Sequence, residues 1–117
     1  MTTHAKKTNL KMIDAHIRPI ESEYTAGSIA SVRATLVFES EDERAALAFA
    51  HRVAADLIEC LGEIADAFGY TAPTVCTYSN GRNRCCATIG YELTKGTQDE
   101  VDKVLELFHD VIPAPKA

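Results

Sequence analysis

Four cysteines are the most chemically reactive side chains of this sequence, and two of them are predicted to face one another. Asn80-Gly81 is typical of a two-residue hairpin turn, because both residues tolerate the positive φ angles of a type I′ turn. Such a turn would place Cys76 opposite Cys85 with their Cβ atoms about 4.5–5.5 Å apart, which is near disulfide range. The pair predicts either a thiol or redox site, joined by Cys60, or two small side chains that fill a tight contact between sheet and helix.

Cys86 is predicted on the other face of the same strand, between Arg84 and Thr88. Nearby guanidinium groups favour the thiolate form of a cysteine, so Cys86 is a candidate reactive residue. Local spacing places no histidine or carboxylate beside it to act as a base. The four cysteines form no C-x-x-C pair, which favours reduced thiols over a disulfide framework or a zinc site.

Basic side chains gather on that predicted outer face, although the chain carries a net charge of −5. The face brings together Asp14, His16, Arg18, Arg33, Arg82 and Arg84 with the hydroxyl groups of Ser31, Thr35, Thr77 and Thr88. A guanidinium group binds carboxylate or phosphate groups through two parallel hydrogen bonds. We therefore predict a binding site, for an acidic protein surface or an anionic small molecule, made of Arg18, Arg33, Arg82, Arg84 and His16. The alternative is a charged face that contacts only solvent.

No group of residues has the types and the spacing that catalysis needs. His16 could act as an acid, a base or a metal ligand, but no second histidine stands at ligand spacing. Glu21, Glu23 and the acidic residues 41–43 fall in a loop and a helix cap, so they do not form a catalytic pair. The sequence predicts no catalytic residue, no metal site and no cofactor, and it favours a role other than that of an enzyme.

Length and composition limit the classes of protein that this chain can belong to. A chain of 117 residues predicts one domain, 1–117, with flexible tails at 1–9 and 113–117. The net charge of −5, and an outer face without a predicted aromatic side chain, argue against nucleic-acid binding. No apolar run approaches the roughly 18 residues of a membrane span, and the N-terminus lacks the apolar core of a signal peptide. We therefore predict a cytoplasmic protein with no membrane partner.

The strands that position these side chains are predicted from alternation. Residues 10–19 and 30–38 alternate between apolar and polar side chains, which indicates two strands joined by the loop 20–28. Pro19 is expected at the end or the edge of the first strand. The second hairpin, around Asn80-Gly81, is predicted to turn toward the core Cys76, Tyr78, Cys85, Ala87, Ile89, Tyr91 and Leu93.

Two capped helices complete the pattern. The first is predicted to run unbroken from Ser40 to Gly69, with a capping box formed by Ser40 and Glu43 and a C-cap at Gly69. The second begins at the capping box of Thr97 and Glu100 and stops before Pro113. The predicted fold is α+β with the order ββαββα, a four-stranded antiparallel sheet with two helices on one face, and it has the pattern of a ββα repeat.

The order of strand, helix, two strands and helix from Val32 to Ile112 resembles the pterin-4a-carbinolamine dehydratases. The run CCATIGYELTKGTQDEVDKVLELF is similar to their final strand, threonine-capped turn and last helix. Their adjacent histidine-proline motif after the long helix has no counterpart, since His51 lies inside the predicted helix and His109 near the end of the last one. The resemblance therefore implies a similar fold and carries no catalytic residues over to this chain.

We expect a small non-catalytic interaction or regulatory protein, an inhibitor-type protein included, that acts through the arginine-rich face or as a homo-oligomer. A homo-oligomer is predicted because the apolar arc of the long helix is wider than one sheet contact needs, and because the sheet leaves two edges unpaired. One alternative is a small-molecule-binding protein or enzyme of the dehydratase-like fold without its histidine motif. The other is a thiol or redox protein that uses Cys76, Cys85 or Cys86.

Overall fold

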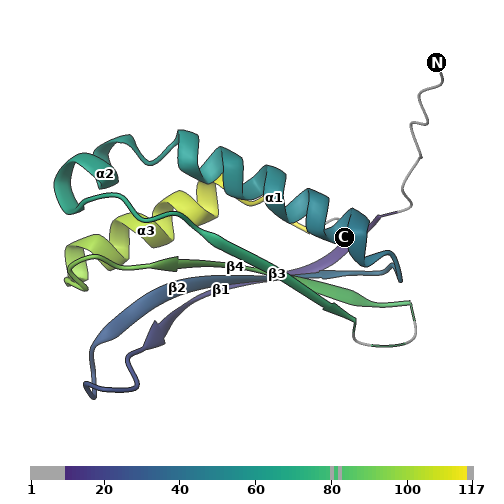
Figure 1. The fold of residues 1–117 in the computed structure, drawn as a ribbon, viewed down its shortest axis with the longest axis horizontal. Helices are drawn as coiled ribbons and strands as arrows, with labels where there is room; N and C mark the ends of the chain where they lie inside the picture. Colours follow the sequence, from purple (N-terminus) through teal and green to yellow (C-terminus); the bar gives the residue numbers. More distant parts are fainter. Residues whose placement is uncertain (1–9, 80, 82, 116–117) are drawn as a thin grey trace.

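The computed structural model describes residues 10–79, 81 and 83–115. Its elements in chain order are β1 (Met12–Glu21), β2 (Ile29–Phe38), α1 (Glu43–Glu59), α2 (Gly62–Phe68), β3 (Thr74–Ser79), β4 (Cys85–Glu92) and α3 (Gln98–Val111). The strands form one antiparallel sheet in the order β1-β2-β4-β3, and all the helices lie on one face of it (Figure 1). The predicted α+β class and the four-stranded antiparallel sheet are confirmed.

The first hairpin follows the alternation of its sequence. The inward side chains of β2 are fully buried, namely Val32, Ala34, Leu36 and Phe38. β1 continues past Pro19 to Glu21, which an edge strand tolerates because its outer side donates to no neighbouring strand. A register shift between Met12 and Asp14 leaves Ile13 as an extra residue, so Asp14 lies on the face away from the helices.

The long helix predicted from Ser40 to Gly69 is two helices in the structure. α1 ends at Glu59 with Cys60 as its C-cap, and α2 begins at Gly62, which has the weakest helix propensity of any residue except proline. Buried side chains occur before, within and after the break, namely Leu57, Leu61 and Ile64. The break turns α2 toward α3, which α2 contacts.

Of the two caps predicted for this segment, the N-cap at Ser40 is wrong and the C-cap at Gly69 is confirmed. The N-cap of α1 is Asp42, whose Oδ1 accepts from the Ala45 N–H at 3.1 Å. Ser40 lies outside the helix, where its hydroxyl accepts from the Asp42 N–H at 3.0 Å. Because the helix begins at Glu43, the cap position falls on Asp42, and its carboxylate suits the positive end of the helix dipole. Gly69 is the C-cap of α2 as predicted, with φ of 98°.

The register of the second hairpin differs from the prediction by three residues. β3 and β4 are joined by the five-residue loop 80–84 rather than by a two-residue turn, so Cys76 lies opposite Thr88 and Cys85 lies opposite Ser79. The predicted Asn80-Gly81 turn includes a residue outside the described part of the chain. The odd shift exchanges the two faces of β3 and leaves those of β4 unchanged.

Thr97 caps α3 as predicted, and its hydroxyl accepts from the Glu100 N–H at 3.3 Å. The Glu100 carboxylate does not return to Thr97. It accepts from the backbone N–H groups of Thr94, Lys95 and Gly96 at 2.9, 2.8 and 2.8 Å, and its side chain is fully buried. A buried carboxylate thus holds the loop that joins β4 to α3.

The core lies between the helix layer and the sheet. α1 packs against β3 and β4, whereas α3 packs against β1 and β2. The side chains that fill this space include Phe38, Leu57, Ile89 and Phe108, each no more than 1 % exposed. Within the described residues, no helix combines the length and the apolar composition that a bilayer crossing requires.

Candidate functional site on the open face of the sheet

The face of the sheet opposite the helices receives side chains from all four strands and is covered by no described helix (Figure 1). We call it the open face. Its residues, from the observed register, are Asp14, His16, Arg18, Ile20, Ser31, Arg33, Thr35, Val37, Thr74, Cys76, Tyr78, Cys86, Thr88, Gly90 and Glu92.

Arg18 and Arg33 lie directly opposite one another on β1 and β2, and both are exposed. Like charges at facing positions of neighbouring strands repel and destabilise the pair. In the part of the chain that the structure describes, the single ion pair joins His16 Nε2 to Asp14 Oδ2 at 2.8 Å. Neither arginine therefore contacts a carboxylate there, and the two guanidinium groups share one end of the open face without neutralisation.

A hollow of about 480 Å³ adjoins this pair. It is lined by residues of all four strands, namely Arg18, Ser31, Arg33, Thr35, Thr74, Cys76, Tyr78, Thr88, Gly90, Tyr91 and Glu92. The two central strands contribute the small residues Thr35, Thr88 and Gly90 to this lining, together with the long side chains of Arg33 and Glu92. A second hollow of about 650 Å³ shares Arg18, Thr35 and Tyr78 with it and extends to His16 and His109.

The predicted site residues do not form one cluster. His16 and Arg18 alternate along β1 on the open face, and Arg33 lies across from Arg18. Arg84 lies in the loop before β4, next to Cys85, which pairs with Phe38 at the far end of β2 from Arg33. About 20 Å of strand therefore separates Arg84 from Arg33. Arg82 lies outside the described residues. The structure thus brings together three of the five predicted residues.

The predicted thiol pair is wrong. Cys76 is exposed on the open face, where its Sγ lies 2.7 Å from Thr88 Oγ1. Cys85 is fully buried on the core face, and burial, followed by the charges of Cys86, Glu43 and Asp42, raises the pKa of its thiol. The two cysteines therefore lie on opposite faces of the sheet, because a three-residue change of register reverses the direction of every β3 side chain.

Tyr78 and Cys86 form the other end of the open face. They pair across β3 and β4, and a hydrogen bond with the Cys86 side chain is the main cause that raises the pKa of Tyr78. Cys86 is only 3 % exposed, so its thiol is closed to a substrate. Tyr78 is 48 % exposed, which places an aromatic side chain on a face that the sequence predicts to have none. The lack of an aromatic side chain on this face is therefore no longer an argument against nucleic-acid binding. The remaining argument against it is the net charge of −5.

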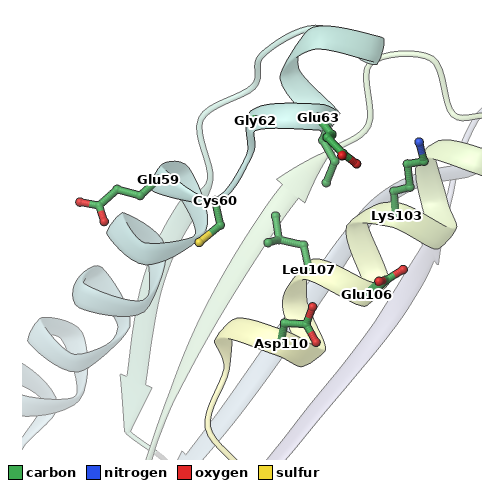
Figure 2. A pocket seen from close by; sticks show the side chains of 9 residues that line it. Glu59, Cys60, Gly62, Glu63, Lys103, Glu106, Leu107 and Asp110 are labelled. Carbon is green, nitrogen blue, oxygen red and sulfur yellow. The ribbon is translucent and has the colours of Figure 1, made fainter.

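A separate hollow of about 420 Å³ lies between α3 and the junction of α1 with α2 (Figure 2). Figure 2 shows Cys60 and Leu107 pointing into this space, whereas the Glu59 carboxylate points away from it. Its other charged residues are Glu63, Lys103, Glu106 and Asp110. No group of three or more histidine, cysteine or acidic side chains is placed to hold a metal ion anywhere in the described part of the chain.

Sequence reasoning missed the β3 contribution to the open face, namely Thr74, Cys76 and Tyr78. The sequence does contain a signal for the longer loop. Asn83, like Gly81, has a positive φ, 61° against 70°, and asparagine tolerates that region better than most residues. A second turn-forming residue after Asn80-Gly81 is thus evidence against a two-residue turn.

Comparison with known protein families, with curated proteins and with solved structures found no significant match to this chain.

Proposed function

We propose that the protein is a non-catalytic interaction protein whose open face binds a carboxylate-bearing segment of another protein. The observation that carries this proposal is the Arg18–Arg33 pair, which faces a hollow and contacts no carboxylate among the described residues. Two repelling guanidinium groups are stabilised when one anion lies between them, because each can donate two hydrogen bonds to it.

The charges that line the hollow favour a carboxylate over a phosphate. Glu92 lines the hollow together with the two arginines, so a ligand meets one negative charge as well as two positive charges. A phosphate monoester carries nearly two negative charges at neutral pH and is repelled by Glu92 more strongly than a carboxylate with one charge.

The shape of the hollow favours an extended segment. Its lining crosses all four strands, a width of about 14 Å at the usual spacing between strands. An extended chain advances about 3.3 Å per residue, so about four residues would cross the face. The hydroxyl group of Thr35 lines this path and can donate to a backbone carbonyl of the bound segment, whereas the Thr74 hydroxyl already donates to the Gly90 carbonyl at 3.5 Å.

A titration followed by NMR tests the proposal. The probe is a peptide of five glutamates, and the matched neutral probe is a peptide of five glutamines. We expect the glutamate peptide to shift the signals of Arg18, Arg33, Thr35 and Thr88, with an affinity that falls as salt is added. R33S should weaken binding at least about tenfold, since a charge-assisted bond contributes about 1.5–3 kcal/mol.

R44S is the matched control, because Arg44 is exposed on α1 and its replacement removes the same charge from the helical side of the molecule. Equal weakening by R44S and R33S would mean that only net charge matters, and the proposed site would be wrong. Inorganic phosphate is the third probe. If phosphate binds to Arg18 and Arg33 and the glutamate peptide does not, the site takes a free anion and the protein-segment proposal is overturned.

A further inference from the structure

The two edges of the sheet differ in how they are protected against pairing. β1, at one edge, carries Pro19, a register shift beside Ile13 and charged or ionisable side chains along its length. Each of these features blocks the addition of another strand. β3, at the other edge, is the six-residue strand Thr74–Ser79 and has no proline, no charge and no register shift. An unprotected edge of this kind is a template for a further strand.

The flank of α1 above that edge is apolar. The flank that carries Phe49 and Cys60 is a different one and faces α3: the Phe49 ring meets the Phe38 ring edge to face, and Cys60 points toward α3 in Figure 2. The opposite flank carries Leu47, His51, Ala55 and Ile58, whose spacing of three and four residues forms one stripe. Since α1 packs on β3 and β4, this stripe lies on the side of the β3 edge. Ile58 is 42 % exposed there, and Leu47 is half-buried.

We infer that two copies of the chain pair antiparallel through their β3 edges, with their α1 flanks in contact. A free peptide strand would pair with β3 but would leave Ala55 and Ile58 exposed, whereas a second copy covers the strand edge and the helix flank together. The Thr74–Ser79 edge has no charged side chain. On α1, Arg44 continues the stripe at its N-terminal end, and the other acidic and basic residues lie outside it, so identical faces approach without strong repulsion. A two-fold dimer also stops at two copies, because pairing uses the β3 edge of both and leaves none free for a third.

The spacing of the layers allows both contacts at once. α1 packs against both β3 and β4, and an axis above the line between these two strands lies about half a strand spacing inside β3. A β3–β3 pair at about 4.8 Å then places the two α1 axes about 10 Å apart. This is the upper end of the usual distance between packed helices, about 8–10 Å.

The available area suits a dimer that dissociates on dilution. α1 has 17 residues and is therefore about 26 Å long, and a helix on a sheet is about 20 Å deep. The flat projection of this face is about 500 Å² per copy, and its accessible area is larger because side chains give it relief. The buried area is thus close to the about 600 Å² per partner at which specific interfaces begin.

Pairing would also complete the binding site, a consequence that rests on the proposed function. The β3 wall of the hollow is formed by Thr74, Cys76 and Tyr78, which lie at the edge that pairs. In the dimer, the same three residues of the second copy continue that wall. The open face then becomes one eight-stranded surface with an Arg18–Arg33 pair on each side of the two-fold axis.

Light scattering after size exclusion, on the whole chain without any ligand, tests the pairing. We expect twice the monomer mass of 12.7 kDa at the top of a micromolar dilution series, and a decrease toward the monomer mass at the bottom. I58E and A55E each place a charge on the α1 flank and should give the monomer mass throughout. A67E is the matched control, because Ala67 is exposed on α2 and its substitution should leave the dimer intact. Circular dichroism should show that all three variants are folded.

Cross-linking locates the contact independently. In a C60S background, Cys76 is the one exposed cysteine left among the described residues. A short bismaleimide should then give a covalent dimer, and A55E should abolish it. The monomer mass for the unmodified chain at every concentration would overturn the inference, as would a dimer that survives both I58E and A55E. The glutamate-peptide titration repeated on folded A55E separates a failure of pairing from a failure of the proposed binding.

Discussion

The Glu100 carboxylate and the Arg18–Arg33 pair are charged groups with opposite surroundings. Glu100 is fully buried and accepts three backbone hydrogen bonds of 2.8–2.9 Å from Thr94, Lys95 and Gly96. The two arginines are exposed, face one another and contact no carboxylate in the described part of the chain. Burial of a charge is costly unless hydrogen bonds replace its water, and Glu100 meets that condition within its own chain.

This difference separates a charge that organises the fold from charges available to a partner. The loop between β4 and α3 has backbone N–H groups that need acceptors, and Glu100 supplies them. Nothing comparable joins Arg18 or Arg33 to the rest of the described structure. We therefore expect substitutions of Glu100 to act on stability and substitutions of the arginines to act on binding.

Tyr91 lies between these extremes, on the core side of the sheet. It is 1 % exposed, and its hydroxyl makes no hydrogen bond of ordinary geometry within the described residues, although Thr71 lies beside it. A buried hydroxyl without a partner costs about 1–3 kcal/mol relative to one that is satisfied. Tyr91 is thus a buried polar group whose removal should help the fold, and Glu100 is one whose removal should harm it.

The largest effect is expected for E100A. The substitution leaves three backbone N–H groups of a buried loop without their acceptor, and it should lower the free energy of unfolding by about 3 kcal/mol. Urea denaturation followed by circular dichroism measures the loss. D99N is the matched control, since Asp99 is exposed in the same helical turn, and it should change the free energy of unfolding by less than about 0.5 kcal/mol. A loss below about 1 kcal/mol for E100A would show that the loop does not depend on this carboxylate.

An effect of opposite sign is expected for Y91F. Removal of the unsatisfied hydroxyl keeps the ring that packs in the core, so the free energy of unfolding should rise by about 1 kcal/mol at neutral pH. Y24F serves as the control, because Tyr24 is 94 % exposed and its hydroxyl is free to bind water. If Y91F is less stable than the original chain, the Tyr91 hydroxyl has a partner and the comparison with Glu100 must be revised.

The same variant should change the alkaline stability. Burial is the main cause that raises the pKa of Tyr91, and the charges of Glu100 and Tyr70 add to it against a lowering contribution from Thr71. Below about pH 10 the tyrosine is neutral in the folded and the unfolded chain, so its contribution is fully present. Above that pH the unfolded chain ionises first and stability is lost. Y91F should therefore lose less stability than the original chain between neutral and strongly alkaline pH, as measured by urea denaturation at each pH.

The parts of the fold that sequence predicts well are those where burial and local pattern agree. Val32 to Phe38 alternates without interruption, and its inward residues are buried as predicted. The break at Cys60 escapes prediction, because the apolar stripe continues through Leu61 and Ile64 as it would in one straight helix. Hydrophobic periodicity reports which residues are buried, and it is insensitive to a bend that keeps them buried.

The candidate site is predictable only as far as its register is predictable. The places of Arg18 and Arg33 follow from alternation along β1 and β2, because each strand has a clear buried face. β3 has no such contrast, since Val75, Thr77 and Tyr78 suit either face, and its direction depends wholly on the length of loop 80–84. The prediction of a two-residue turn at Asn80-Gly81 therefore assigns every β3 side chain to the wrong face.

The smallest effect on stability, and the sharpest test of the comparison, is expected for R18S and R33S. Each removes one of two like charges at facing positions, so the free energy of unfolding should stay within about 0.5 kcal/mol or rise slightly. The double variant should gain less than the sum of the single variants, because both relieve the same repulsion.

Salt distinguishes this repulsion from a change in packing. Added salt screens exposed charges, so any difference between R33S and the original chain should shrink as ionic strength rises. A packing difference would persist in salt. If R18S or R33S instead lowers the free energy of unfolding by more than about 1 kcal/mol, the arginines support the fold as Glu100 does, and the distinction between the two regions fails. If the arginines act in binding and not in folding, R18S and R33S should leave the free energy of unfolding unchanged and weaken binding of the glutamate peptide.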